Sequence, residues 1–289
     1  MNLNFWIIQI LNALSLGTLL FLVAAGLSMI FGLMRIVNVA HGSFYMLGAY
    51  VALEALRVIH NQLVAALVAG ITMGILGALL QSTLIARLKN DSLRQILLTF
   101  GFLLVVGDFA LIIWHGTAAI LPPPPELAGS VRIAGTSYPV YRLFVIATGV
   151  LLAAALDWLQ SRTRIGAMVR AGVDDLEMLS CMGINVRRLF VAVFALGTAI
   201  AGLGGAIGGV FLGVHPGVDL EIGILAFVVV IVGGLGNVRG TLAASLLIGL
   251  IDNLSKALVP EISMFAIYLL MVVVILVRPA GLFGRRSLA

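Results

Sequence analysis

A few polar or ionisable side chains lie within or beside the long apolar stretches of this sequence, namely Asn12, Asn38, His41, Glu54, Asp108, His115 and Asp252. A charge at membrane depth is costly, so such a residue indicates a function by default. Glu54, His115 and Asp252 lie near the ends of apolar stretches, and we expect them to reach the outer interface. Asp108 lies deeper, and we expect a protonated or hydrogen-bonded carboxyl that faces other helices.

These residues do not form a catalytic set. The sequence has neither the H-E-x-x-H pattern of zinc enzymes nor a G-x-S-x-G nucleophile elbow. In the glycine-rich stretch GGLGNVRGT, residues 233–241, Arg239 replaces the third glycine of the dinucleotide fingerprint, and no P-loop Lys-Ser or Lys-Thr follows. With one cysteine and four scattered histidines, a metal site is not expected. We therefore predict no enzyme, no cofactor and no metal.

The composition is that of an integral membrane protein. Of the 289 residues, 62% are hydrophobic and only 10% are charged, with a mean hydropathy of +1.18. Charged residues are absent from residues 1–34, 61–86, 189–218 and 262–277. Near-continuous apolarity favours helices over a transmembrane barrel. We predict nine segments, with eight full spans as the alternative, near 6–33, 40–57, 63–87, 93–114, 141–160, 188–212, 220–236, 240–256 and 262–278.

The basic residues predict the orientation. With the N-terminus outside and the C-terminus inside, only Arg57, Arg132, Arg142 and Lys256 face outward, so 13 of the 17 Lys and Arg lie inside. This charge is spread over loops and builds no basic face, which argues against nucleic-acid binding. The single cysteine, Cys181, excludes an intrachain disulfide and lies on the reducing cytoplasmic side.

The longest predicted outside loop runs over about 115–139 and contains four consecutive prolines at 122–125. Such a run forms a stiff polyproline II strut. The strut is either a spacer or a docking rim for an external partner.

The longest predicted inside loop spans residues 162–188. Asp174, three residues before Glu177, is typical of an acidic capping box, and Gly183 suits the position after a helix C-cap. A short helix is therefore predicted over about 175–182.

This short helix mixes acidic residues with Met178, Leu179 and Met182, which have no evident partner within the chain. An isolated helix of this length is marginal in water. It must therefore lie on the membrane surface of its own chain or insert into a groove of a cytoplasmic subunit.

Three stretches closely resemble the branched-chain amino-acid ABC importer permeases: IVNVAHGSFYMLGAYVA at 36–52, GGLGNVRGTLAASLLIG at 233–249 and RPAGLFGRR at 278–286. Their order and spacing fit, and the N-x-A-H-G and R-P-x-G-L-F-G elements are specific to this group. The resemblance covers essentially the whole chain. It implies an all-α polytopic membrane protein with eight to nine transmembrane helices, in which residues 1–289 form one permease domain of the shorter type.

The same resemblance implies the partners: a homologous second permease, two cytoplasmic ABC ATPase subunits that bind the ATP, an external substrate-binding protein and membrane lipid. It implies a multi-pass protein of the bacterial inner membrane and makes GGLGNVRGT a tight connection between two helices. It also makes 162–188 a cytoplasmic coupling loop, in which the expected ATPase-coupling residues are Asp174, Asp175, Glu177, Met178, Leu179, Met182 and Gly183.

The substrate stays open at this stage. The resemblance implies import of leucine, isoleucine or valine by alternating access, but related permeases serve urea and short amides, and a stand-alone channel or secondary carrier is a further alternative. A pore that passes a zwitterion needs only apolar walls and a few polar groups. The candidate path residues are Asn38, His41, Ser43, Tyr45 and Asp108, with His41 expected near the inner mouth.

Overall fold

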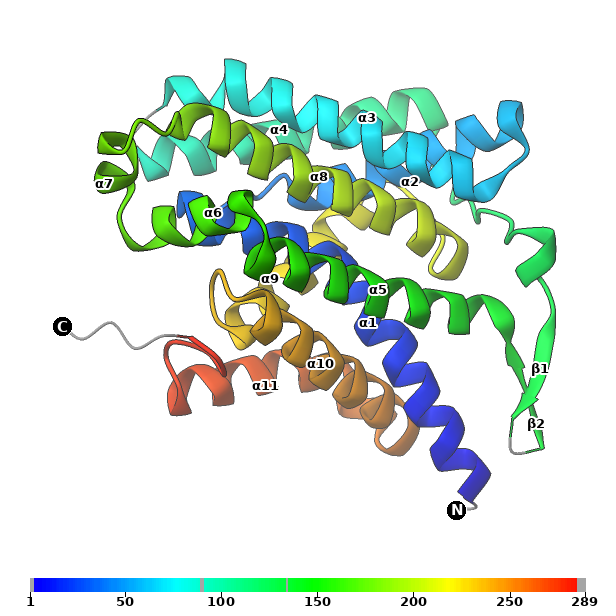
Figure 1. The fold of residues 1–289 in the computed structure, drawn as a ribbon. Coiled ribbons are helices and arrows are strands. Elements are labelled where there is room, and N and C mark those ends of the chain that lie inside the picture. Colours follow the sequence, from blue (N-terminus) through cyan, green and yellow to red (C-terminus); the bar gives the residue numbers. More distant parts are fainter. Residues whose placement is uncertain (1–2, 89–90, 134, 285–289) are drawn as a thin grey trace.

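The computed structural model describes residues 3–88, 91–133 and 135–284, and most of them are helical (Figure 1). The long helices are α1 (Leu3–Met34), α2 (His41–Ile59), α3 (Gln62–Thr83), α4 (Ser92–Trp114), α5 (Val140–Arg162), α8 (Val186–Phe211) and α10 (Val238–Leu258). The shorter ones are α6 (Arg164–Asp174), α7 (Leu176–Cys181), α9 (Val218–Gly233) and α11 (Ser263–Val277). Single 3-10 turns are η1 (Ile85–Arg87), η2 (Pro125–Leu127) and η3 (Pro260–Ile262).

The protein is an all-α polytopic membrane protein, as the sequence predicts. Within the described residues, seven helices are long and apolar enough to cross a membrane. The two remaining predicted segments correspond to α9 and α11, which have 16 and 15 residues. Each of the nine predicted segments therefore matches one helix. Helices α9 and α11 are shorter than the roughly 20 residues that a full span needs.

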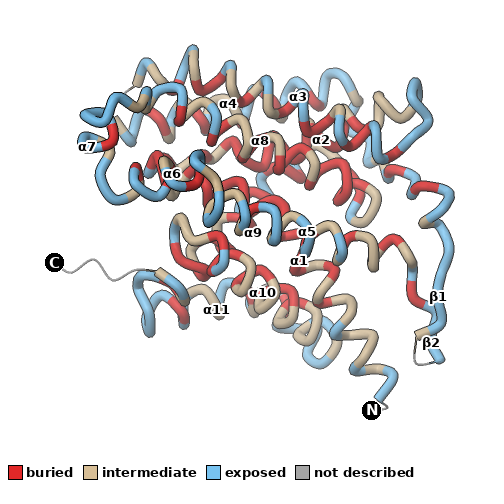
Figure 2. The backbone as a smooth tube through the Cα atoms, in the orientation of Figure 1, coloured by how far each residue is buried: buried red, intermediate tan, exposed pale blue. Residues whose placement is uncertain are grey.

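The uncharged helix α1 lies at the centre of the fold. It is buried over most of its length and packs against α5, α8, α9 and α10 (Figure 2). Small residues allow these close approaches: a Cβ added to Gly26 would overlap the backbone of Gly197 in α8. The glycines of α8 are thus packing residues.

The chain turns back into the bundle between α1 and α2. Arg35, just after α1, has a left-handed φ of 53°, and His41 opens α2 with its Nε2 donating to the carbonyl oxygen of Val23 at 3.0 Å. Val23 lies about three turns, roughly 16 Å, before the end of α1 at Met34. The expectation that His41 lies near the inner mouth is therefore wrong, because residues 36–40 run back along α1 before α2 begins.

The glycine-rich stretch connects α9 to α10 as a tight turn. Gly234 and Gly236 have φ values of 103° and 79°, and the Asn237 side chain accepts the Gly240 N–H at 3.0 Å to cap α10. The Leu282 N–H donates to the Val232 carbonyl oxygen at 2.8 Å, which fastens the segment after α11 to this turn. Two of the three recognised sequence stretches therefore form one structure.

The long loop after α4 contains a small hairpin that the sequence patterns do not reveal. Strands β1 (Ser130–Ile133) and β2 (Thr136–Pro139) pair antiparallel, with Val131 opposite Tyr138. Figure 1 shows the hairpin at one end of the helix bundle and α7 at the opposite end. This arrangement is the one that the predicted outside and inside loops require.

Candidate functional site

The first candidate site is a buried polar junction, which we define as Asn38, His41, Ser43 and Asp219. It forms where α2 and α9 begin beside the middle of α1. Ser43 Oγ donates to Asp219 Oδ2 at 3.2 Å, and a Cβ on Gly42 would overlap the carbonyl oxygen of Asp219. The two helices therefore meet backbone to backbone at the junction.

Several polar atoms at the junction lack partners within the described chain. Asn38 and His41 are fully buried, yet both side-chain polar atoms of Asn38 and the Nδ1 of His41 make no hydrogen bond. Because the Val23 carbonyl can only accept, His41 Nε2 must donate, which makes Nδ1 an acceptor in the neutral ring. Buried polar groups of proteins are normally satisfied, so Asn38 and His41 are candidate ligand-binding groups.

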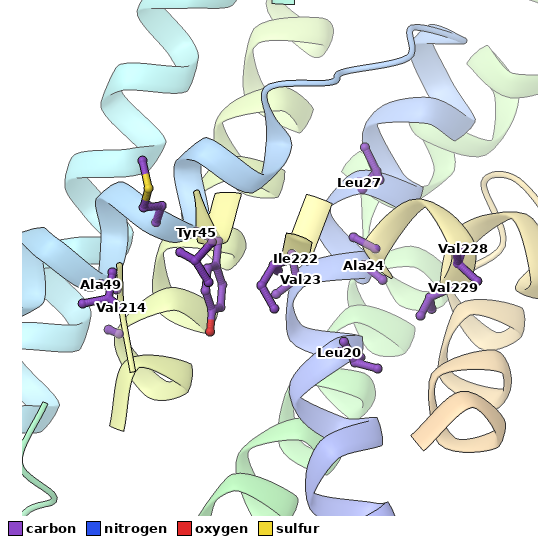
Figure 3. Packing of buried hydrophobic residues seen from close by; sticks show 14 of the residues in the cluster. Leu20, Val23, Ala24, Leu27, Tyr45, Ala49, Val214, Ile222, Val228 and Val229 are labelled. Carbon is purple, nitrogen blue, oxygen red and sulfur yellow. The ribbon is translucent and has the colours of Figure 1, made fainter. Parts of the chain in front are cut away.

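Tyr45 lies next to the junction, one turn further along α2. Its ring is fully buried against α8, its hydroxyl has no partner in the described residues, and a Cβ on Gly208 would overlap that hydroxyl. Figure 3 shows Tyr45 in the same core as Val23 of α1 and Ile222 of α9. The candidate path residues of α2 therefore point to three different helices: His41 contacts α1, Ser43 contacts α9 and Tyr45 packs against α8.

Asp219 is the junction residue that sequence reasoning missed. It is only 3% exposed and lies in the first turn of α9, although the sequence placed the start of this span at about residue 220. The sequence signal that could have revealed Asp219 is its position directly before the apolar run of α9. An acidic residue there is usually an exposed helix start, and only the contact with Ser43, 176 residues away along the chain, shows otherwise.

Asp108 does not join the junction. It is exposed on the outer face of α4, beside the exposed Leu104, Val105 and Phe109. The expectation that its carboxyl faces other helices is therefore not met within this chain. α4 makes few contacts with the rest of the chain, and this leaves the Asp108 face uncovered.

The three residues expected at the outer interface have different surroundings. Glu54 pairs with Arg57 at 2.9 Å and accepts the Trp114 Nε1–H at 3.0 Å, while His115 follows α4 in a left-handed conformation. Asp252 is buried, but its carboxylate reaches the exposed Lys256 at 2.7 Å. Glu54 and Asp252 thus each pair with a basic residue of their own helix, and His115 ends α4.

The second candidate site is the loop between α5 and α8, where α6 precedes the predicted short helix. α7 spans Leu176–Cys181, Met182 is its C-cap, and Gly183 follows with a φ of 78°. The capping residue is Asp175, whose Oδ1 accepts the N–H groups of Glu177 and Met178 at 2.9 Å. The predicted capping box from Asp174 is wrong, because Asp174 is the last residue of α6.

The apolar residues of α7 divide between the two sides of the helix. Leu179 is only 2% exposed and packs near Leu33 and Gly172, so the expectation that it lacks a partner within the chain is wrong. Met178 and Met182 are 65% and 72% exposed. Leu179 therefore anchors α7, from which Met178 and the C-cap residue Met182 present flexible apolar side chains outward.

The sequence is similar to membrane transport permeases over almost its full length. A family model described as "Branched-chain amino acid transport system / permease component" matches residues 9–275. The high-affinity branched-chain amino acid transport system permease protein LivH of Salmonella typhimurium is 27% identical over 96% of this chain and 95% of its own. The corresponding BraD of Pseudomonas aeruginosa is 25% identical over the same shares. The fructose import permease FrcC of Rhizobium meliloti is 27% identical over 63% of this chain and 52% of its own.

No solved structure matches the chain. The helical fold and the sequence matches together define a multi-pass membrane transport subunit. The chain belongs to the family of branched-chain amino acid transport system permease components. This result confirms the family that the three recognised stretches indicated.

Proposed function

We propose that the chain is a translocation subunit of an ATP-driven importer that carries leucine, isoleucine or valine into the cytoplasm by alternating access. The relatives that cover more than nine-tenths of this chain, LivH and BraD, are named for branched-chain amino acids, and this supports the substrate class. A homologous second permease, two ATPase subunits and an external binding protein complete the importer, in the bacterial inner membrane. This chain hydrolyses no ATP itself.

The observation that carries the proposal is the outward surface of α7. A six-residue helix is not stable alone in water, but the Asp175 cap and the Leu179 anchor hold it at one end of the bundle. The exposed Met178 and Met182 fit an apolar groove on an ATPase, and the acidic Glu177 can pair with a basic rim. Movement of the ATPase groove would then be transmitted through Leu179 to the hydrophobic core of the permease.

The polar junction supports the transport step. Its groups are closed off from solvent, so a solute can reach Asn38 and His41 only when the surrounding helices move apart. Opening the junction toward one side at a time is alternating access in physical terms. The backbone contact between Gly42 and Asp219 belongs to the closed state of this pathway.

Reconstituted transport tests the proposal directly. Proteoliposomes with both permeases and the ATPases, supplied with binding protein, should accumulate labelled leucine, isoleucine or valine only when ATP is available to the ATPases. Urea and acetamide should not be taken up. Uptake by this chain alone on an ion gradient would mean that it is a carrier.

The native Cys181 gives a test of orientation without engineering. It is the only cysteine and is exposed on α7. In spheroplasts that carry the permeases without the ATPase subunits, we expect an impermeant maleimide to leave Cys181 unlabelled while they are intact and to label it after permeabilisation. A Cys181→Ser, Ala128→Cys variant is the control and should react from outside. Labelling of Cys181 in intact spheroplasts would invert the orientation.

We expect Asp108→Leu to reduce uptake at least fivefold without reducing insertion or thermal stability. A carboxylate that faces lipid is unfavourable, by up to about 3 kcal/mol at the helix centre, so we expect the exposed face of α4 to meet protein or water in the assembled importer. The matched control is Val105→Leu on the same exposed face. Full uptake by Asp108→Leu, with unchanged membrane levels, would show that the carboxyl has no part in transport.

A further inference from the structure

A cavity of about 420 Å³ lies beneath α7, between the end of α1, the end of α3, the start of α4 and the start of α8. Its size is that of a small-molecule site. Leu176 of α7 forms part of its wall, so the cavity touches the segment proposed to couple to the ATPase. Neither the polar junction nor the exposed surface of α7 includes this space.

A buried amide marks the cavity as a polar binding site. Gln81 lines the cavity and is only 3% exposed, and its side-chain oxygen has no hydrogen-bond partner within the described chain. An unpaired buried acceptor is unfavourable, so this position calls for a donor such as an ammonium or hydroxyl group.

Two guanidinium groups border the same cavity. Arg187 donates to the Ser82 carbonyl oxygen at 3.1 Å, and Arg35 donates to the Val173 carbonyl oxygen at 3.4 Å. Neither belongs to a salt bridge in the part of the chain that the structure describes. Each guanidinium has five N–H donors, so both retain donors and an unneutralised charge for a carboxylate.

Most of the remaining walls are apolar, and the polar exceptions are Ser92 and Gln95 at the start of α4. The apolar walls come from Met34, Ile36, Ile85, Leu176 and Phe190. The cavity thus combines cationic donors, one buried acceptor and apolar surface, which are the features that recognise a carboxylate, an ammonium group and a hydrocarbon side chain in one molecule.

We propose that this cavity binds an apolar α-amino acid from the cytoplasmic side. Its carboxylate pairs with Arg187 and Arg35, its ammonium group donates to the Gln81 oxygen, and its side chain lies against Ile85 and Phe190. Because Leu176 forms part of the cavity wall, an occupied site holds α7 in place, so an accumulated amino acid slows its own import. This inference rests on the proposed function, because it takes the ligand to be the imported solute class.

Equilibrium binding of labelled leucine to the whole permease–ATPase complex tests the inference. The complex is measured without binding protein, in phosphatidylcholine nanodiscs, so that anionic headgroups do not compete for the arginines. Gln81→Leu and Arg187→Gln should each weaken leucine binding at least tenfold. The matched control is Arg188→Gln, which removes the same charge from the next residue, outside this cavity, and should bind like wild type.

Two analogues assign the contacts. Leucinamide lacks the carboxylate and should compete at least tenfold more weakly than leucine. 4-Methylpentanoate lacks the ammonium group and should compete equally well with wild type and with Gln81→Leu. In proteoliposomes, preloaded internal leucine should slow ATP-driven uptake by wild type and by Arg188→Gln but not by Gln81→Leu.

Equal leucine binding by all variants, or none by wild type, would overturn the inference. Either result can occur while ATP-driven uptake of branched-chain amino acids persists, and the proposed function then stands. Loss of ATP-driven uptake by the wild-type complex is the separate result that rejects the proposed function.

Discussion

Met178→Asp should release the ATPase subunits from the permease and reduce ATP-driven uptake more than 100-fold. Met178 is 65% exposed in α7, so the substitution leaves the fold of this chain intact. In an apolar groove of the ATPase, the new carboxylate would be buried without a partner, at a cost of about 3 kcal/mol or more. The measurements are ATPase co-purification and ATP hydrolysis stimulated by loaded binding protein.

The matched control for Met178→Asp is Val131→Asp on β1, at the opposite end of the bundle. Val131 is also exposed, at 47%, and its substitution should leave ATPase co-purification unchanged. If Met178→Asp retains full co-purification and hydrolysis, α7 is a surface feature and does not contact the ATPase. Leu179→Asp cannot replace this test, because Leu179 is buried in the chain and its substitution would disturb the α6–α7 fold itself.

Gly42→Ala should abolish uptake and lower the thermal stability of the permease in detergent by several degrees. The added methyl group would overlap the carbonyl oxygen of Asp219 and lie 3.0 Å from the Gly223 N–H nitrogen. Both neighbours are backbone atoms, so no rotamer change relieves the overlap and α2 must move away from α9. Overpacking of this kind costs typically about 1–3 kcal/mol, and it also breaks the contact between Ser43 and Asp219.

The control for Gly42→Ala is Gly101→Ala in α4, where an added Cβ has no heavy atom within 4 Å. Alanine is also the better helix former, so Gly101→Ala should preserve uptake and stability. Thermal unfolding followed by size-exclusion chromatography gives the stability, and leucine uptake gives the function. Equal behaviour of the two variants would show that the close contact between α2 and α9 is not needed for the closed junction.

The sequence by itself determined the membrane class, the family and the positions of the nine apolar helices, but not α6. Charge-free runs longer than a bilayer crossing leave few choices for a chain in lipid, because each backbone polar group must be satisfied within its own helix. Local sequence signals also predict the structure where a single turn determines the geometry of the chain. The turn between α9 and α10 needs the left-handed conformations of Gly234 and Gly236, which glycine adopts without strain.

Only the tertiary structure decided which side chains meet and at what depth. The depth of His41 depends on residues 36–40, which turn back along α1 without a periodic pattern that a sequence can display. Asp219 and Leu179 look like an exposed helix start and a free apolar residue, yet both are buried by segments distant in the chain. Apolarity in a membrane protein does not separate a lipid-facing side from a protein-facing side, because both are apolar. Which side of each helix faces protein, and therefore which residues form the polar junction, follows from how the helices pack.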